Sequence, residues 1–211
     1  MTRTGDAAAK AQLRSRIRAD RRARDGSGAD FARVLDSCLP DAGAILAYAA
    51  LAGEPDLDAF LDAARARGRA VYLPVTTPGE PLRFGRLSGP MAALPRVGRW
   101  QIREPEAELT AAEVVAGTEQ HPAVGVVFVP GLAYSSAGAR LGNGGGFYDR
   151  TFGPQGQVPA GSAGVPFIGV CYAAEAGLAV RAEEWDLQVS AVATELGVRP
   201  VAAGSGAGAC E

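Results

Sequence analysis

Residues 124–149 read VGVVFVPGLAYSSAGARLGNGGGFYD, and this stretch decides the fold. The apolar run 124–129 is typical of a buried strand. Glycines at positions 142, 144, 145 and 146 then leave the backbone free to turn several N–H groups toward one point. Such a nest of donors suits a phosphate, more so if a helix begins directly behind it. The alternative is a flexible surface loop, and the preceding strand together with the following Phe-Tyr-Asp favours the phosphate loop.

Two charged residues flank the glycines. Arg140 places a cationic fork beside them, and Asp149 puts a carboxylate where a phosphate-bound Mg²⁺ would need one. Asp149 has a second interpretation, as the cap of a helix behind the glycines. The loop lacks the G-K-[ST] ending of a Walker A motif. The dinucleotide fingerprint also fails, because Phe147 occupies the position of its third glycine.

The rest of the chain alternates strands with helices. We predict strands at 44–48, 70–75, 124–129, 167–172 and 186–192, and helices at 7–25, 30–38, 55–67 and 111–117. Pro55 is expected at the first helical position with Glu54 at or next to the N-cap, and Gly68 at the stop. Residues 76–105 are expected to form hairpins and loops. This order predicts a three-layer α/β sandwich around a mostly parallel sheet, CoA-transferase-like, with ligands beyond the carboxyl ends of the strands.

Composition limits the classes of protein that fit. The 211 residues are 47% hydrophobic and 21% charged with a net charge of −2, which indicates one globular domain over 1–200 and gives no reason to expect nucleic-acid binding. The Gly- and Ala-rich segment 201–211 is expected to be a disordered tail. No run is apolar enough to span a membrane, and three distant cysteines build neither a disulfide framework nor a zinc site. We therefore expect a cytoplasmic protein, and a monomer.

Two residue types are scarce. Against 20 arginines the chain has a single lysine, Lys10, and a single histidine, His121. Lys10 and Arg14 are four apart on the first predicted helix, so both side chains project from one face. His121 lies in a Gln-His-Pro loop and is expected at the surface. The remaining carboxylates, arginines, lysine and backbone dipoles suit phosphoryl transfer better than histidine chemistry.

These residues resemble the 5-formyltetrahydrofolate cyclo-ligase (methenyltetrahydrofolate synthetase) family. Its motif G-x-R-L-G-x-G-x-G-[YF]-Y-D is matched from Gly138 to Asp149. The family's N-terminal K-x-x-x-R is matched by Lys10 and Arg14, and its Glu after the first strand by Glu54. A C-terminal D-x-x-[VM]-x-x-[VI]-x-T-E segment is matched from Asp186 to Glu195. Order and approximate spacing agree from Ala8 to Val198.

The resemblance implies closure of 5-formyltetrahydrofolate to 5,10-methenyltetrahydrofolate with ATP and Mg²⁺, giving ADP and phosphate. It implies a role in catalysis for Lys10, Arg140 and Tyr148. The residues that it implies hold the ATP phosphates are Lys10, Arg14, Arg140, Leu141, Gly142, Asn143, Gly144, Gly145, Gly146, Phe147 and Tyr148. Asp149 and Asp186 would take the metal. Ala49, Glu54, Trp100 and Tyr148 would contact the reduced folate.

The chemistry agrees with these residue types. Transfer of the γ-phosphoryl group to the formyl oxygen gives an iminium phosphate, which N10 attacks as phosphate leaves. This needs alignment and charge neutralisation more than a nucleophile, and oriented donors can each contribute about 3–4 kcal/mol to transition-state stabilisation.

Three positions depart from the family pattern. Asn143 and Gly145 stand where many members have Tyr or Arg and some have Lys, and Trp185 replaces a His often found before the aspartate. Two alternatives therefore stay open. One is a diverged, non-catalytic nucleotide- or folate-binding relative. The other is a phosphate-ligand isomerase on the same fold, for which Glu54 would be the obvious acid–base carboxylate.

Overall fold

A seven-stranded sheet forms the centre of the molecule. The computed structural model describes residues 3–24 and 29–201. The sheet strands are β1 (Ala44–Leu46), β2 (Val71–Val75), β3 (Arg83–Arg86), β6 (Val124–Pro130), β9 (Phe167–Val170), β10 (Ala191–Thr194) and β11 (Gly197–Pro200), in the order β11-β10-β9-β6-β1-β2-β3. The five inner strands pair in parallel, and the two edge strands, β11 and β3, pair antiparallel to their neighbours.

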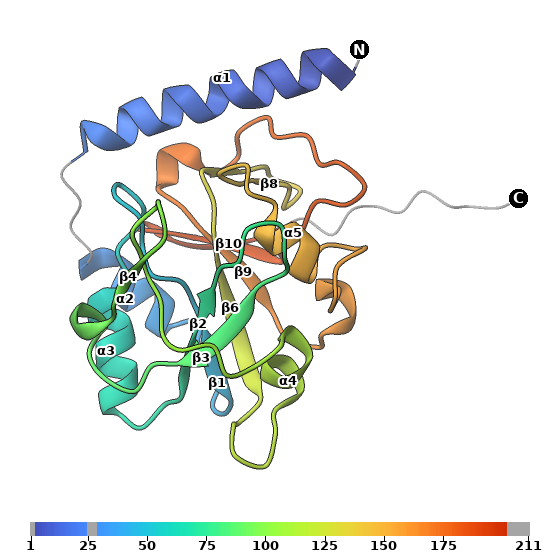
Figure 1. The fold of residues 1–211 in the computed structure, drawn as a ribbon. Coiled ribbons are helices and arrows are strands. Elements are labelled where there is room, and N and C mark those ends of the chain that lie inside the picture. The colour runs from blue at the N-terminus through green and yellow to red at the C-terminus, as the bar shows by residue number, and fades with distance from the viewer. Residues whose placement is uncertain (1–2, 25–28, 202–211) are drawn as a thin grey trace, which may run out of the picture.

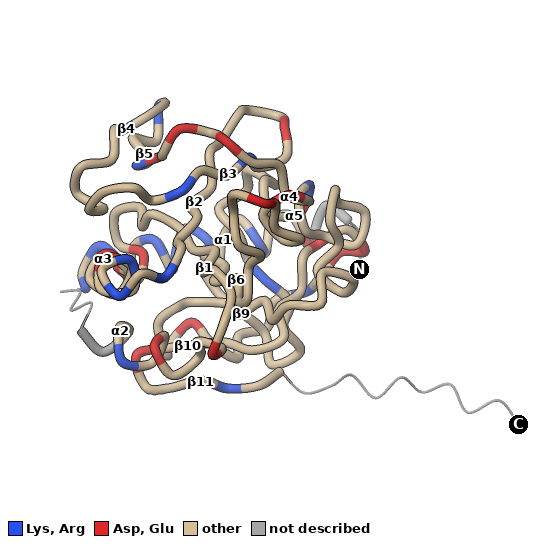
Figure 2. Tube along the Cα trace, turned by 90° about the horizontal axis from the view of Figure 1, so that it is seen from below, with Lys and Arg blue, Asp and Glu red and all other residues tan. Residues whose placement is uncertain are grey.

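Helices cover both faces of this sheet. Figure 2 looks along the strands, with α2 (Ala29–Asp36) and α3 (Asp58–Ala66) on one side and α4 (Ala111–Ala116) and α5 (Phe147–Phe152) on the other. Because side chains alternate along a strand, Val126 and Phe128 of β6 join the α2/α3 core, whereas Val127 and Val129 join the opposite core. The predicted three-layer α/β sandwich is confirmed.

The long helix α1 (Arg3–Arg22) lies outside these layers, across one end of the sheet (Figure 1). Its narrow apolar stripe, Leu13 and Ile17, packs with residues of a small hairpin made of β7 (Ala133–Tyr134) and β8 (Arg140–Leu141). The sequence did not predict this hairpin, which separates β6 from the glycine loop. It gives α1 the apolar surface on which it docks.

The segment 76–105 is built as predicted, from hairpins and loops. β3 joins the sheet edge, and β4 (Arg96–Val97) and β5 (Ile102–Arg103) form a separate two-stranded hairpin. Three short 3₁₀ helices, η1 (Met91–Ala93), η2 (Ala160–Ser162) and η3 (Ala173–Glu175), complete the elements of the described chain.

Two predicted boundaries are wrong. The strand predicted at 186–192 begins only at Ala191, because the Asp186 N–H donates to the Glu183 carbonyl and the Asp186 carboxylate accepts the Glu183 N–H in a tight turn. The helix predicted from Pro55 begins at Asp58, so Glu54 caps no helix. Its stop is correct: Gly68 has a φ of +83° and follows the last turn.

The described chain ends inside the domain. Val201, which the sequence assigned to the tail, donates its N–H to the Ser190 carbonyl and packs against the α4/α5 core. The predicted disorder of 202–211 concerns residues outside those described. Within 3–24 and 29–201, no helix combines the length and the apolar character that crossing a membrane requires.

Candidate active site

The candidate site lies at the carboxyl edge of the parallel strands. β1, β6 and β9 run in the same direction, so the segments that follow them gather at one edge. Glu54 follows β1, the β7–β8 hairpin and glycine loop follow β6, and Glu175 follows β9. Helix α1 lies across all three segments. The glycine loop therefore lies where the fold predicts a ligand site.

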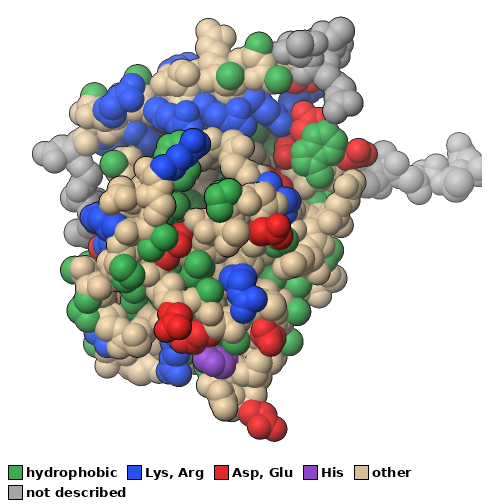
Figure 3. All heavy atoms as spheres, viewed as in Figure 1, with side chains coloured by type: hydrophobic (Ala, Val, Ile, Leu, Met, Phe, Trp, Pro, Cys, Tyr) green, Lys and Arg blue, Asp and Glu red, His purple; other side chains and the backbone are tan. Residues whose placement is uncertain are grey.

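Helix α1 directs a row of cations at this edge. Lys10, Arg14, Arg18 and Arg21 follow one another at intervals of three or four residues, which places them on one helix face. In Figure 3, basic side chains line the underside of α1 above a hollow in the surface. The sequence analysis identified only the first two. The spacing carried the signal for the others, but α1 is rich in arginine on every face.

Each cation of the row contacts a different part of the site. The Lys10 ammonium is 3.2 Å from the Asp186 carboxylate and 3.4 Å from that of Glu183. Arg14 donates its Nε–H to the Gly142 carbonyl at 2.9 Å. Arg18 donates to the backbone carbonyl and the side-chain oxygen of Asn143, both at 3.1 Å. The row thus reaches both the glycine loop and one predicted metal ligand.

The cations are crowded. Partial burial lowers the pKa of Arg14, and the positive charges of Arg18 and Arg140 lower it further, against the opposing effect of Asp186. Like charges held this close favour the binding of an anion between them.

Arg21 anchors the helix. It donates Nε–H and an Nη2 hydrogen to the two oxygens of Glu175 at 2.9 and 2.7 Å, and Nη2 also donates to the Gly131 carbonyl at 2.7 Å. Both side chains are 4% exposed. Burial lowers the pKa of Arg21, but the hydrogen bonds and charge of Glu175 more than offset this, and the pKa is raised overall.

The glycine loop, residues 142–146, needs glycine for two different reasons. At Gly142 a Cβ would lie 2.7 Å from an Nη atom of Arg140, so a side chain would collide with the guanidinium. Gly146 has a φ of +67° and directly precedes α5, in a conformation that residues with side chains rarely adopt. Gly144 and Gly145 are exposed, Phe147 is half-buried and Leu141 is buried under α1. A helix begins behind the glycines as the phosphate-loop prediction required, although α5 spans six residues only.

Arg140 is buried beneath the loop. Its Nη2 donates to Asp149 at 2.8 Å and its Nη1 to the Pro130 carbonyl at 3.3 Å. Burial lowers the pKa of Arg140, while the Asp149 charge raises it and prevails. The Nε of Arg140 is buried without a hydrogen-bond partner among the described residues. A buried donor of this kind calls for an acceptor from a ligand or water.

Tyr148 lies beside this guanidinium, whose carbon is 5.3 Å from the ring centroid. Burial raises the pKa of the Tyr148 hydroxyl well above its ordinary range, and the Arg140 charge only partly opposes this. The hydroxyl therefore stays protonated at neutral pH, so it can donate a hydrogen bond but does not serve as a general base.

The predicted metal ligands lie near each other. Asp149 accepts the N–H of Leu187, the residue after Asp186, at 3.1 Å. Asp149 does not cap α5, whose N-cap Gly146 has no side chain to accept a bond, so the capping alternative is wrong. No group of three or more His, Cys, Asp or Glu side chains in the described ranges could hold a metal. The protein offers two carboxylates, which suits Mg²⁺ bound mainly through substrate phosphates.

Glu54 is linked directly to the glycine loop. Asn143 donates its side-chain N–H to one Glu54 oxygen at 3.1 Å, and the Leu51 N–H donates to the other at 3.0 Å. Burial raises the pKa of Glu54, which these two bonds and the Arg21 charge oppose. The predicted folate contact and the predicted phosphate loop are therefore one connected site.

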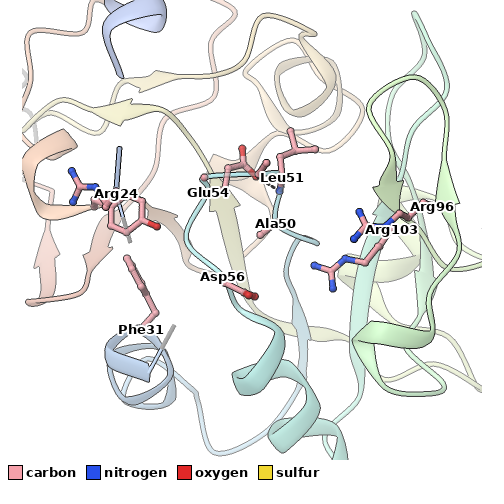
Figure 4. Close-up of a pocket in the computed structure, with 11 residues that line it drawn as sticks. Arg24, Phe31, Ala50, Leu51, Glu54, Asp56, Arg96 and Arg103 are labelled. Atoms are coloured by element: carbon pink, nitrogen blue, oxygen red, sulfur yellow. Dashed lines mark hydrogen bonds between the residues drawn. The ribbon is translucent and has the colours of Figure 1, made fainter. Parts of the chain in front are cut away.

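The other two predicted folate residues are placed less centrally. A pocket of about 370 Å³ opens beside Glu54, and Figure 4 shows the side chains that line it. Ala49 is buried one residue before the pocket-lining segment 50–54. Trp100 lies at the turn of the β4–β5 hairpin and is 60% exposed. Two residues of the same hairpin, Arg96 and Arg103, line the pocket.

This geometry agrees with comparison to known proteins. The profile of the 5-formyltetrahydrofolate cyclo-ligase family matches residues 6–195. The chain belongs to this family. The 5-formyltetrahydrofolate cyclo-ligase of Mycolicibacterium smegmatis is 31% identical over 153 residues, which cover 67% of this chain and 74% of that protein.

Two solved structures share the cyclo-ligase fold. The 5,10-methenyltetrahydrofolate synthetase of Aquifex aeolicus is 25% identical, with a TM-score of 0.69 over 92% of this chain and 94% of that one. A 5,10-methenyltetrahydrofolate synthetase from Mycoplasma pneumoniae is 18% identical, with a TM-score of 0.62 over 87% and 96%.

The structure gives a local reason for one departure of this cyclo-ligase from the family pattern. Asn143 joins Arg18 to Glu54 through its side-chain oxygen and nitrogen, a bridge that requires both a donor and an acceptor. Gly145 is exposed, and its carbonyl accepts a hydrogen bond from Arg150 at 2.9 Å. Nothing in the structure explains Trp185 in place of His.

The raised pKa of Glu54 gives this cyclo-ligase a specific pH dependence of stability. A carboxyl whose pKa is raised by folding contributes most to stability in acid, and loses that contribution as pH rises from 4.5 through the raised value. We expect the difference in unfolding free energy, wild type minus Glu54→Gln, to fall with rising pH, by about 1.4 kcal/mol per unit of pKa shift. Urea unfolding between about pH 4 and pH 8 measures it. A difference that rises with pH would show that folding stabilises the Glu54 anion instead.

Proposed function

We propose that this chain catalyses the ATP- and Mg²⁺-dependent cyclisation of 5-formyltetrahydrofolate to 5,10-methenyltetrahydrofolate, with release of ADP and phosphate. The observation that carries the proposal is the convergence of Lys10, Arg14 and buried Arg140 on the glycine loop, with Asn143 joining that loop to Glu54. Membership of the cyclo-ligase family supports the same activity.

ATP binds, in this proposal, with its phosphates over the glycine loop. The partnerless Nε of Arg140 and the collision that a Cβ would cause at Gly142 both fit a phosphate oxygen approaching the backbone. The row Lys10, Arg14 and Arg18 supplies positive charge from the opposite side. Such fixed donors align the γ-phosphoryl group and neutralise charge without a nucleophilic side chain.

Asp149 and Asp186 would hold Mg²⁺, which when bound supplies charge neutralisation at the phosphates. Both carboxylates are engaged by cations, Asp149 by Arg140 and Asp186 by Lys10. The cations therefore keep the two carboxylates ionised and close to the loop.

The folate binds on the Glu54 side. Glu54 offers carboxylate oxygens to N–H groups of the pterin, and Tyr148 offers a protonated hydroxyl. The formyl oxygen attacks the γ-phosphorus, and the bond from that phosphorus to the ADP oxygen breaks. N10 then attacks the formyl carbon, phosphate leaves with the formyl oxygen, and the N10 proton is lost. No covalent bond to the protein forms, and burial raises the pKa of the Cys171 thiol far from the range of a useful nucleophile.

A direct assay tests this function. Purified protein mixed with 5-formyltetrahydrofolate, ATP and Mg²⁺ should give methenyl product, followed by its near-ultraviolet absorbance, and omission of ATP or chelation of Mg²⁺ should abolish it. Absence of product from folded protein would refute the proposal. Binding of both ligands without product would identify a non-catalytic relative.

We also propose a cytoplasmic monomer. Cys38 and Cys171 are free thiols, which suits a reducing compartment. The candidate site is built from one chain, so turnover requires no second copy. Sedimentation at the assay concentration tests the monomer.

A further inference from the structure

The pocket beside Glu54 has a wall of arginine that the cyclisation chemistry does not use. Arg96 and Arg103 point into the pocket from the β4–β5 hairpin, whereas Glu54 and Leu51 come from the segment after β1 (Figure 4). The wall therefore belongs to an element separate from the glycine loop and from α1.

The two arginines differ in what they bind. Arg103 donates to both oxygens of Asp58, one of them at 2.9 Å, and so anchors the hairpin to α3. Arg96 makes one weak contact, from Nη1 to the Gln101 carbonyl at 3.2 Å. It forms no ion pair with any carboxylate in the described part of the chain. Arg96 is thus the hairpin cation with its charge available to a ligand.

The hairpin turn places an aromatic ring next to this charge. Trp100 is largely exposed, and the Arg99 guanidinium lies 4.6 Å from its ring centroid. Gln101 adopts a φ of +51°, which is uncommon for a residue with a side chain, and donates its side-chain N–H to the Gly98 carbonyl at 2.8 Å. The turn is therefore fixed by its own bonds, with an apolar platform and cations at the pocket mouth.

We infer that Arg96 binds the glutamate carboxylates of the folate and sets a preference for glutamylated substrates. This rests on the proposed function. A folate carries a pterin at one end, then an aminobenzoyl ring, then one or more glutamates. With the pterin at Glu54, the ring reaches the Trp100 platform and the carboxylates reach Arg96. A guanidinium binds carboxylate strongly and in a fixed orientation, whereas Arg103 is already neutralised by Asp58.

The test compares two substrates that differ only in the glutamate. 5-Formyltetrahydrofolate carries it, and 5-formyltetrahydropteroate lacks it. For Arg96→Gln, kcat/KM and affinity for the glutamylated substrate should fall roughly ten-fold to a hundred-fold, the range for loss of a charged hydrogen bond, mainly through KM. Both quantities for the pteroate should stay at the wild-type value. Arg86→Gln, on β3 and outside the pocket lining, is the matched control and should change neither.

Equal losses on both substrates, or no loss on either, would overturn the inference. Dissociation constants from calorimetry provide a readout that does not depend on turnover. If wild-type protein binds both folates without converting them, the proposed function fails, and the ratio of dissociation constants still decides the role of Arg96. Added salt should reduce the wild-type preference for the glutamylated substrate and leave that of Arg96→Gln unchanged.

Discussion

Lys10→Ala is expected to lower kcat by about two to three orders of magnitude while the protein stays folded. In the proposed reaction the ammonium is a fixed cation at the transferred phosphoryl group, and loss of one such donor costs roughly 3–4 kcal/mol of transition-state stabilisation. Its present partners, Asp186 and Glu183, hydrogen-bond to each other's segment without it, so the turn remains intact. Initial rates of methenyl formation at saturating ATP and folate measure the effect.

The matched control is Arg16→Ala. Arg16 is on the same helix and its side chain is 78% exposed, so it tests the loss of one positive charge from α1 without a change at the glycine loop. Wild-type kcat in Lys10→Ala would remove the phosphate assignment. Arg140→Ala is a less clean test, because it would also leave the Asp149 carboxylate without its partner.

Arg21→Met is expected to lower the free energy of unfolding by about 3–5 kcal/mol. Removal of one member of a buried ion pair leaves the other charge uncompensated, here Glu175 at 4% exposure. The Gly131 carbonyl loses its donor as well. Urea denaturation followed by circular dichroism gives the difference.

The double variant Arg21→Met with Glu175→Leu separates charge from docking. Apolar replacement of both members of a buried pair is often neutral or better, so most of the lost stability should return. Turnover should remain low in the double variant, because α1 then loses the bonds that hold it to the segment after β9. A single variant as stable as wild type would show that the pair contributes nothing to the fold.

Most of the fold was predictable because local patterns determine it. The apolar runs 44–48, 70–75 and 124–129 gave strands at the right places, and the glycine loop fell at the ligand-binding edge of the sheet. The failures share one cause. Asp186 and Glu54 were assigned from neighbours in sequence, whereas each is held by bonds that depend on the tertiary structure or a tight turn.

The candidate site was predictable in composition but not in its connections. A motif places Lys10, Arg14 and Arg140 in one site, yet no spacing reveals that Asn143 reaches Glu54 across 89 positions of sequence. Arg18 and Arg21 were missed for a related reason. Their roles depend on what lies opposite α1, namely the loop at Asn143 and the carboxylate of Glu175.

The contacts of Lys10 bear on how nucleotide is held. Its ammonium rests against the carboxylates of Glu183 and Asp186, so the unliganded protein already supplies anions to its own cation. In the proposed function a triphosphate replaces those anions, and its electrostatic gain is the difference between two sets of partners. Nucleotide alone should then bind weakly, and a divalent cation that takes up the displaced aspartate should tighten it.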